Sequence, residues 1–201
     1  MKYLTLLLLL VLSLPTLAET PAPAPDPKLA AALEKAFAAK PGTPEFNAAL
    51  QSAAPLATAV DVATDPEKTA FKKLTLNSAG KRIDVIRFRT PAGKPLDLSW
   101  AFAAGPNSVE VWYILPAQGE MKGFTNFHRI KPETVNKKYE IPATHGVIAQ
   151  HLPAANFKPD ADYLLWFTFP DAKPHDVHVA INFVPTTGNN DAALRKALNL
   201  K

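Results

Sequence analysis

The chain has 201 residues, of which 47% are hydrophobic, 20% charged and 9% aromatic. This composition is typical of one globular domain, and it excludes an intrinsically disordered chain, which would carry fewer apolar residues and more charge. The chain contains no cysteine. A disulfide scaffold, an iron–sulfur site, a thiol nucleophile and any zinc site that needs a thiolate are therefore excluded.

Residues 1–18 are typical of a secretory signal peptide. Lys2 supplies the positive start, residues 4–14 form an apolar run, and Thr16 and Ala18 place small side chains at the two positions that a signal peptidase reads. The run is shorter than the roughly 18–20 residues that span a bilayer, which disfavours a membrane anchor. We therefore predict an exported protein, periplasmic or extracellular, with no transmembrane segment after cleavage at Ala18.

The charge of the chain is mild. The formal net charge is +4, the predicted cleavage removes one positive charge with Lys2, and the basic residues are spread along the sequence. Nucleic acid is therefore not expected as a partner. A protein or glycan of the cell envelope fits the predicted destination better, and the sequence leaves the oligomeric state open.

Two short helices are predicted before the strands begin. Residues 19–27 form an extended spacer rich in proline and alanine, and the helical segment covers residues 28–55. Each helix has only a narrow apolar stripe, so both helices are expected to pack on another surface. The stripes consist of Leu29, Leu33 and Phe37 in the first helix and Phe46, Ala49, Leu50 and Ala53 in the second.

From about residue 56 the hydrophobic period changes to two, which indicates strands. Many short strands with turn-rich connections predict an antiparallel β-sandwich over residues 56–186, so the fold class is mainly β with a short N-terminal helical segment. The tail, residues 187–201, is expected to add a short helix bearing Leu194 and Leu198. The strongest strand candidates are 96–102, 109–115, 163–169 and 177–183, and the weaker ones are 57–63, 70–76, 83–89, 135–141 and 146–152.

Three aromatic motifs carry a resemblance to a known family. Trp100 ends the pattern Leu-x-Leu-x-Trp, Tyr113 lies in the next alternating stretch, and Phe157, Pro159 and Tyr163 have the spacing of a tyrosine corner. Together they resemble a fibronectin type III domain, an immunoglobulin-like sandwich, over roughly residues 82–186. One departure is the stretch from residue 115 to residue 147, which is longer than the family's usual connection.

The resemblance implies an arrangement of strands and a kind of function. It implies that the strands at 109–115, 163–169 and 177–183 are neighbours in one sheet, and that the Tyr163 hydroxyl bonds to backbone a few residues upstream. It also implies a tendency to bind or to space other domains, and it implies no catalytic residues.

Strand alternation then predicts a candidate ligand-binding face. If Tyr113 and its alternate neighbours face the core, then Trp112, Trp166, His178 and Asn182 face outward on one sheet. In one interpretation the two tryptophans form an aromatic platform for a glycan or partner protein, with His178 and Asn182 as hydrogen-bonding neighbours. In the other, which we favour, the N-terminal helices cover this face, because a monomer rarely leaves so large an apolar patch exposed.

Metal and enzyme chemistry have weak signals. The close histidine pairs are His175 with His178, whose spacing on a strand points them to opposite faces, and His145 with His151, about 20 Å apart on an extended strand. We predict no metal site and no cofactor. The sequence also lacks a G-x-S-x-G elbow and a glycine-rich phosphate loop, so no catalytic residues are predicted.

The resulting functional prediction is a non-catalytic binding module that recognises a protein or glycan of the envelope or extracellular space. The alternative is a structural or assembly protein of the periplasm or cell surface whose tryptophan face is internal. A hydrolase would require a serine or acidic cluster assembled in space, which a sequence does not reveal.

Overall fold

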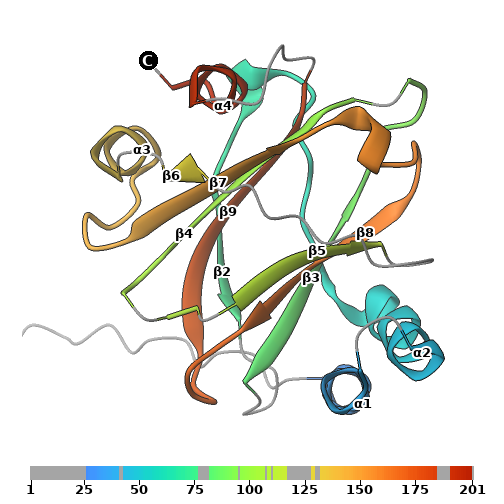
Figure 1. The fold of residues 1–201 in the computed structure, drawn as a ribbon. Helices are drawn as coiled ribbons and strands as arrows, with labels where there is room; N and C mark the ends of the chain where they lie inside the picture. Colours follow the sequence, from blue (N-terminus) through green and yellow to red (C-terminus); the bar gives the residue numbers. More distant parts are fainter. Residues whose placement is uncertain are drawn as a thin grey trace, which may run out of the picture.

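The computed structural model describes residues 26–40, 43–76, 82–94, 96–106, 108–109, 111–116, 128–129, 132–184 and 191–200. The predicted signal peptide and residues 19–25 of the predicted spacer lie outside the described residues. Two sheets pack face to face, with two helices beside each (Figure 1). The mainly β sandwich predicted from the hydrophobic period is confirmed. Within the described residues, no helix is long and apolar enough to cross a membrane.

The first sheet has four strands and is antiparallel except for its first pair. In order across the sheet, its strands are β1 (Thr58–Ala59), β3 (Ile83–Arg89), β8 (Asp162–Thr168) and β5 (Val111–Pro116). β1 runs parallel to β3, and the pairs of β8 with β3 and with β5 are antiparallel.

The second sheet has five strands and is antiparallel throughout. In order, its strands are β2 (Lys72–Leu76), β9 (His175–Phe183), β4 (Leu98–Ala104), β7 (Gly146–Leu152) and β6 (His128–Arg129). All its pairings are antiparallel. Three 3₁₀ turns complete the list of short elements: η1 (Ala54–Leu56), η2 (Pro66–Lys68) and η3 (Ala154–Asn156).

The core between the sheets is aromatic. Trp100 is 1% exposed, its ring stacks on Phe102, and its indole N–H donates to the Gln150 side-chain oxygen at 3.1 Å. This bond satisfies the one polar group of the indole away from water. The alternation predicted for β8 and β9 is confirmed, because the buried core includes Tyr163, Leu165, Phe167, Val179 and Ile181.

Two helices cover the outer face of the first sheet, as the favoured interpretation predicts. They are α1 (Pro27–Ala38) and α2 (Pro44–Ala53), each with proline in its first turn and a side-chain cap from Asp26 or Thr43. Those caps and prolines fix where each helix begins. The buried cluster beneath them joins Leu33, Phe46 and Leu50 to Ile83, Val85, Leu164 and Trp166 of the sheet.

One member of the predicted helical stripe does not pack. Phe37 is 64% exposed, whereas Leu33 is fully buried and Ala36 is 1% exposed. Residues four apart advance by more than one full turn, so the stripe drifts around the helix. Ala32 and Ala36 are buried, and their small side chains let α1 pack closely against α2 and the first sheet. Phe37 therefore lies on the exposed side of the helix.

A second pair of helices covers the outer face of the second sheet. They are α3 (Pro132–Tyr139) and α4 (Asp191–Ala197), and the latter is the tail helix predicted to carry Leu194 and Leu198, both fully buried. The strand predicted at 135–141 is wrong, because α3 occupies most of it. Glu133 in the first turn and Lys137 and Lys138 in the last turn complement the helix dipole. The strand prediction overlooked this helical signal because it followed the spacing of the apolar residues.

The predicted adjacency of β8 and β9 is also wrong. β8 lies between β3 and β5 in the first sheet, and β9 lies between β2 and β4 in the second. The connection at 169–174 therefore passes from one sheet to the other. Outward-facing side chains explain the placement: Ala180 of β9 pairs with Ala101 of β4, and these small residues leave room for α4.

The hydrogen bond of the predicted tyrosine corner is confirmed. The backbone N–H of Lys158 donates to the Tyr163 hydroxyl oxygen at 2.9 Å. The Tyr163 ring packs between Phe88 and Phe157 in the core between the sheets. The corner therefore fixes the chain where it enters β8.

Candidate functional site

A crossover segment, residues 58–63, joins the edges of the two sheets. Its start pairs with β3, where the Val60 N–H donates to the Arg87 carbonyl at 2.8 Å. Its end bridges to β9, where the Ala63 N–H donates to the Ile181 carbonyl at 2.9 Å. Because the segment leaves one sheet before it reaches the other, a recess opens beside it.

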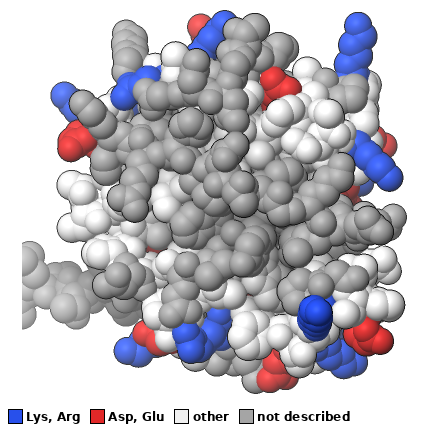
Figure 2. Space-filling model, viewed as in Figure 1, with Lys and Arg blue, Asp and Glu red and all other residues white. Residues whose placement is uncertain are grey.

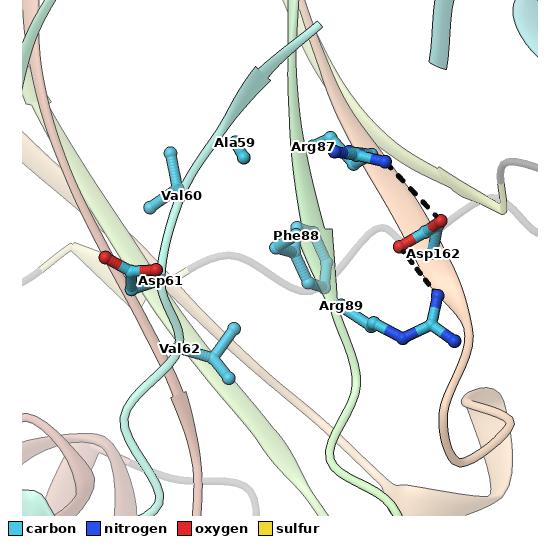
Figure 3. A pocket seen from close by; sticks show the side chains of 8 residues that line it. All are labelled: Ala59, Val60, Asp61, Val62, Arg87, Phe88, Arg89 and Asp162. Carbon is cyan, nitrogen blue, oxygen red and sulfur yellow. Dashed lines mark ion pairs between the residues drawn. The ribbon is translucent and has the colours of Figure 1, made fainter. Parts of the chain in front are cut away.

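This recess is an open groove of about 550 Å³, which we call the Arg–Asp groove. Figure 3 shows the crossover segment on one side and β3 on the other, with Asp162 of β8 between two guanidinium groups. Half-buried Val62 supplies accessible apolar lining, Val60 and Phe88 are almost fully buried at 5% and 2% exposed, and the charges lie around them. The lining residues are Ala59, Val60, Asp61, Val62, Arg87, Phe88, Arg89 and Asp162.

Ion pairs order the charged side of the groove. Asp162 lies 3.8 Å from the Arg87 guanidinium and 3.2 Å from that of Arg89, and the Arg89 Nε donates to Asp160 at 2.9 Å. The hydrogen bond to Asp160, followed by the one to Asp162, raises the pKa of Arg89. The Arg89 side chain is still 55% exposed, so its remaining N–H groups are available to a ligand.

Asp61 adds a carboxylate on the opposite wall. Its side chain is exposed, and the described residues give it no ion pair and no hydrogen bond. The groove and its rim therefore combine two guanidinium groups with three carboxylates. Such a surface matches a ligand that presents charged groups of both signs beside an apolar group.

The charges of the groove continue a strand pattern. Arg87 and Arg89 follow Val85 at a spacing of two on the outer face of β3, and Asp162 precedes Leu164 in the same way on β8. α1 and α2 cover the apolar end of this face and leave the charged end open. The face predicted to bind through tryptophan thus offers arginine and aspartate instead.

Trp166 of the predicted site is buried. It is 5% exposed, and its ring lies 6.3 Å from that of Phe46 under the N-terminal helices. Trp166 is therefore part of the packing between helices and sheet, and it does not form an open aromatic platform.

The side chain of Trp112 lies outside the described part of the structure. The backbone register pairs Trp112 with Phe167 and Tyr113 with Trp166. Trp112 is therefore not opposite Trp166 in the ladder between β5 and β8, and its contact with a ligand stays a prediction.

His178 and Asn182 lie on the second sheet, away from both tryptophans. His178 is 7% exposed and its ring centre lies 5.4 Å from that of His145. Asn182 is 1% exposed and donates to the Thr69 hydroxyl at 2.8 Å and to the Ala197 carbonyl at 2.7 Å. The structure therefore does not bring the four predicted residues together, and ligand contact by any of them stays a prediction.

A serine, a histidine and an aspartate do meet, which sequence spacing did not reveal. Ser99 Oγ lies 2.7 Å from His151 Nδ1, and His151 Nε2 lies 3.4 Å from Asp97. Serine, histidine and aspartate are the residues of a hydrolytic triad, but here the two ring nitrogens are exchanged, because in a triad Nε2 faces the serine and Nδ1 faces the aspartate. Ser99 is also 0% exposed, so a substrate carbonyl has no approach to its hydroxyl in this conformation. The three side chains fasten β7 to β4.

Among the described residues seen in Figure 2, charged side chains of both signs occur. Lysines and arginines lie around the rim of this view and are interspersed with aspartates and glutamates among the described residues.

No protein-family profile and no curated protein matches the sequence. Among solved structures, the chain is similar to the pre-peptidase C-terminal domain of a collagenase from Bacillus anthracis. The two are 10% identical with a TM-score of 0.35, and the match covers 62% of this chain and 93% of that one. A likeness of this degree assigns no function.

Proposed function

We propose that the chain is an exported, non-catalytic binding module that recognises a protein partner of the envelope or extracellular space through the Arg–Asp groove. The observation that supports it most is the groove itself, an open recess of about 550 Å³ with an apolar lining and charges of both signs. Export rests on the signal peptide predicted at residues 1–18.

The lining of the groove favours a peptide segment over a glycan. Sugar rings stack on open aromatic faces, and Phe37 is the one exposed large hydrophobic side chain among the described residues. Phe88 in the groove is 2% exposed. Aliphatic side chains between carboxylates and guanidinium groups better match an extended peptide segment. In that segment an apolar residue would stand beside a basic residue, and the basic residue would pair with Asp61.

The resemblance to fibronectin type III domains supports a binding or spacing role. β4 pairs with β7 and β5 pairs with β8, which is how strands B with E and C with F pair in immunoglobulin-like sandwiches. The Tyr163 corner adds to the likeness, and the position of β9 departs from it. We propose the relation for these four strands.

The test is selection of peptides from a displayed random dodecamer library on the mature chain, in parallel with a glycan array. The Asp61→Lys variant places a longer side chain in the groove and reverses the charge of that wall. Glu67→Lys is the control, because Glu67 is exposed, lies outside the groove and undergoes the same change in charge. We expect enriched peptides with a basic residue beside an apolar one, bound by wild type and Glu67→Lys and lost in Asp61→Lys. Equal binding by both variants, or binding of glycans alone, would contradict the proposal.

A second candidate is the structural or assembly protein, which the burial of Trp166 favours. In that case the helix-covered face is part of the folded unit, and association occurs elsewhere. This candidate expects no peptide that depends on Asp61, together with a mass above that of one chain in sedimentation. A monomer that binds peptides through the groove would count against it.

A further inference from the structure

Two histidines that are far apart in the sequence meet on the outer side of the second sheet. His145 lies in the turn before β7, where its N–H donates to the Pro142 carbonyl at 2.9 Å. His178 lies in β9, opposite Ala103 of β4 and Lys73 of β2. The ring centres are 5.4 Å apart and the ring planes are inclined by 56°.

Each ring leaves one nitrogen without a partner. The Nδ1 atoms of His145 and His178 are both buried, and neither has a hydrogen-bond partner among the described residues. His178 is 7% exposed, so water does not readily satisfy its ring. Buried polar atoms are nearly always paired, and an orphaned pair at one place calls for an occupant. A neutral imidazole nitrogen is a common metal ligand.

The spacing of the rings matches that occupant. In a tetrahedral site, zinc lies about 2.0–2.1 Å from each imidazole nitrogen, which puts the centres of two coordinating rings about 5.2 Å apart. The observed 5.4 Å agrees with this value. Ala103 lies opposite His178, and Gly105 lies on the Cδ2 and Nε2 side of the His145 ring, so neither places a large side chain beside the pair.

The charged groups facing the pair are Lys73 and Asp176. Asp176 accepts from Thr75 Oγ1 at 2.6 Å and pairs with the Lys73 ammonium at 2.7 Å, so its carboxylate is already engaged. The described residues contain no group of three or more metal-ligating side chains. An ion held here would therefore take two ligands from the protein and the others from water, entering from the half-buried His145 side.

We propose that His145 and His178 form a binding site for a borderline transition-metal ion, with Zn²⁺ and Cu²⁺ as the class of ligand, through their two Nδ1 atoms. This site lies on the second sheet and does not depend on the Arg–Asp groove. It revises the sequence-based expectation of no metal site, because the fold pairs His145 with His178 instead of with His151.

The experiment is a Zn²⁺ titration of the mature chain by calorimetry, with the imidazole nitrogens followed by NMR. His145→Ala is the test variant because His145 is only half-buried, and His175→Ala is the control because that ring bonds to Asp171 outside the pair. We expect one equivalent bound with a Kd below about 0.1 mM, at least tenfold weaker in His145→Ala and unchanged in His175→Ala.

Two results would overturn the proposal. One is the absence of saturable binding at this level in the wild type, with the folded state verified by circular dichroism. The other is equal affinity in His145→Ala, or NMR shifts at imidazoles other than those of His145 and His178, which would place the ion elsewhere. A Nδ1 shift of both rings on addition of Zn²⁺ supports the site even where a variant loses stability.

Discussion

The Tyr163 hydroxyl accepts a hydrogen bond from the backbone N–H of Lys158, five residues upstream, at 2.9 Å. This bond closes the loop that leads into β8, and Thr90 reinforces the loop by donating to the Lys158 carbonyl at 2.6 Å. β8 is the strand on which the first sheet is built, since it pairs with both β3 and β5. Loss of the tyrosine corner is therefore expected to destabilise the whole first sheet.

We expect Tyr163→Phe to lower the free energy of unfolding by about 1–2 kcal/mol, because the aromatic packing remains while the partly buried Lys158 N–H loses its acceptor. Urea denaturation followed by circular dichroism measures the change. A loss below about 0.3 kcal/mol would show that water replaces the hydroxyl without cost.

Trp166→Ala is expected to cost about 3–5 kcal/mol, because it leaves a cavity between the N-terminal helices and the first sheet. The matched control is Phe37→Ala, an aromatic truncation at a 64% exposed position, for which a change within about 0.5 kcal/mol is expected. Thermal and urea unfolding of both variants check this. Similar losses in the two variants would mean that the helices are not packed on Trp166 in solution.

Ser99→Ala is expected to lower stability by about 1–3 kcal/mol, because the buried His151 ring loses the partner that lies 2.7 Å from its Nδ1. The wild-type chain is expected not to react with a fluorophosphonate, which labels activated serines. Mass spectrometry of the treated chain gives the answer. Labelling of Ser99 would show that its hydroxyl is accessible and activated, which contradicts a purely structural role.

Stability is expected to fall on acidification below about pH 6.5. Burial lowers the pKa of His178, and burial also lowers that of His145. The folded state therefore binds fewer protons than the unfolded state between the unfolded pKa of about 6.5 and the lower folded values, so stability rises with pH through that window. Each histidine contributes a slope of at most about 1.4 kcal/mol per pH unit.

The His178→Gln variant tests this dependence. It removes one of the two titrating rings, so the difference between the unfolding free energies at pH 7 and pH 5 is expected to shrink. Urea denaturation at both pH values, without added metal, supplies the four numbers. The same difference in wild type and variant would assign the pH dependence to other groups.

Local patterns in the sequence predicted the elements whose cause is local. Asp26, Thr43 and the prolines after them mark the helix starts, and alternation marks the strands predicted at 163–169 and 177–183. The tyrosine corner was predictable for the same reason, because its donor and acceptor are five residues apart. At 135–141 a strand-like and a helix-like signal conflicted, and the helix that forms, which ends at Tyr139, buries Val135 against the second sheet.

The features that failed prediction depend on contacts between distant residues. Alternation along one strand does not show which residue of β8 lies opposite Trp112 or Tyr113, and only the pairing of β5 with β8 decides it. The sheet that β9 joins depends on small residues of β4, which are far away in sequence. The Arg–Asp groove, the contact of Ser99 with His151 and the pairing of His145 with His178 likewise join separate segments, so no spacing rule reports them.

The crossover segment has a mechanical consequence for a chain with a predicted N-terminal spacer. It is hydrogen-bonded to β3 through Val60 and to β9 through Ala63, and it directly follows the helices. A pull on the N-terminal end therefore meets the helices first, and then a segment clamped to both sheets at once. Tension that strips α1 and α2 would stop at this clamp and leave the two sheets joined, so the crossover segment sets the point at which the sandwich resists being drawn apart.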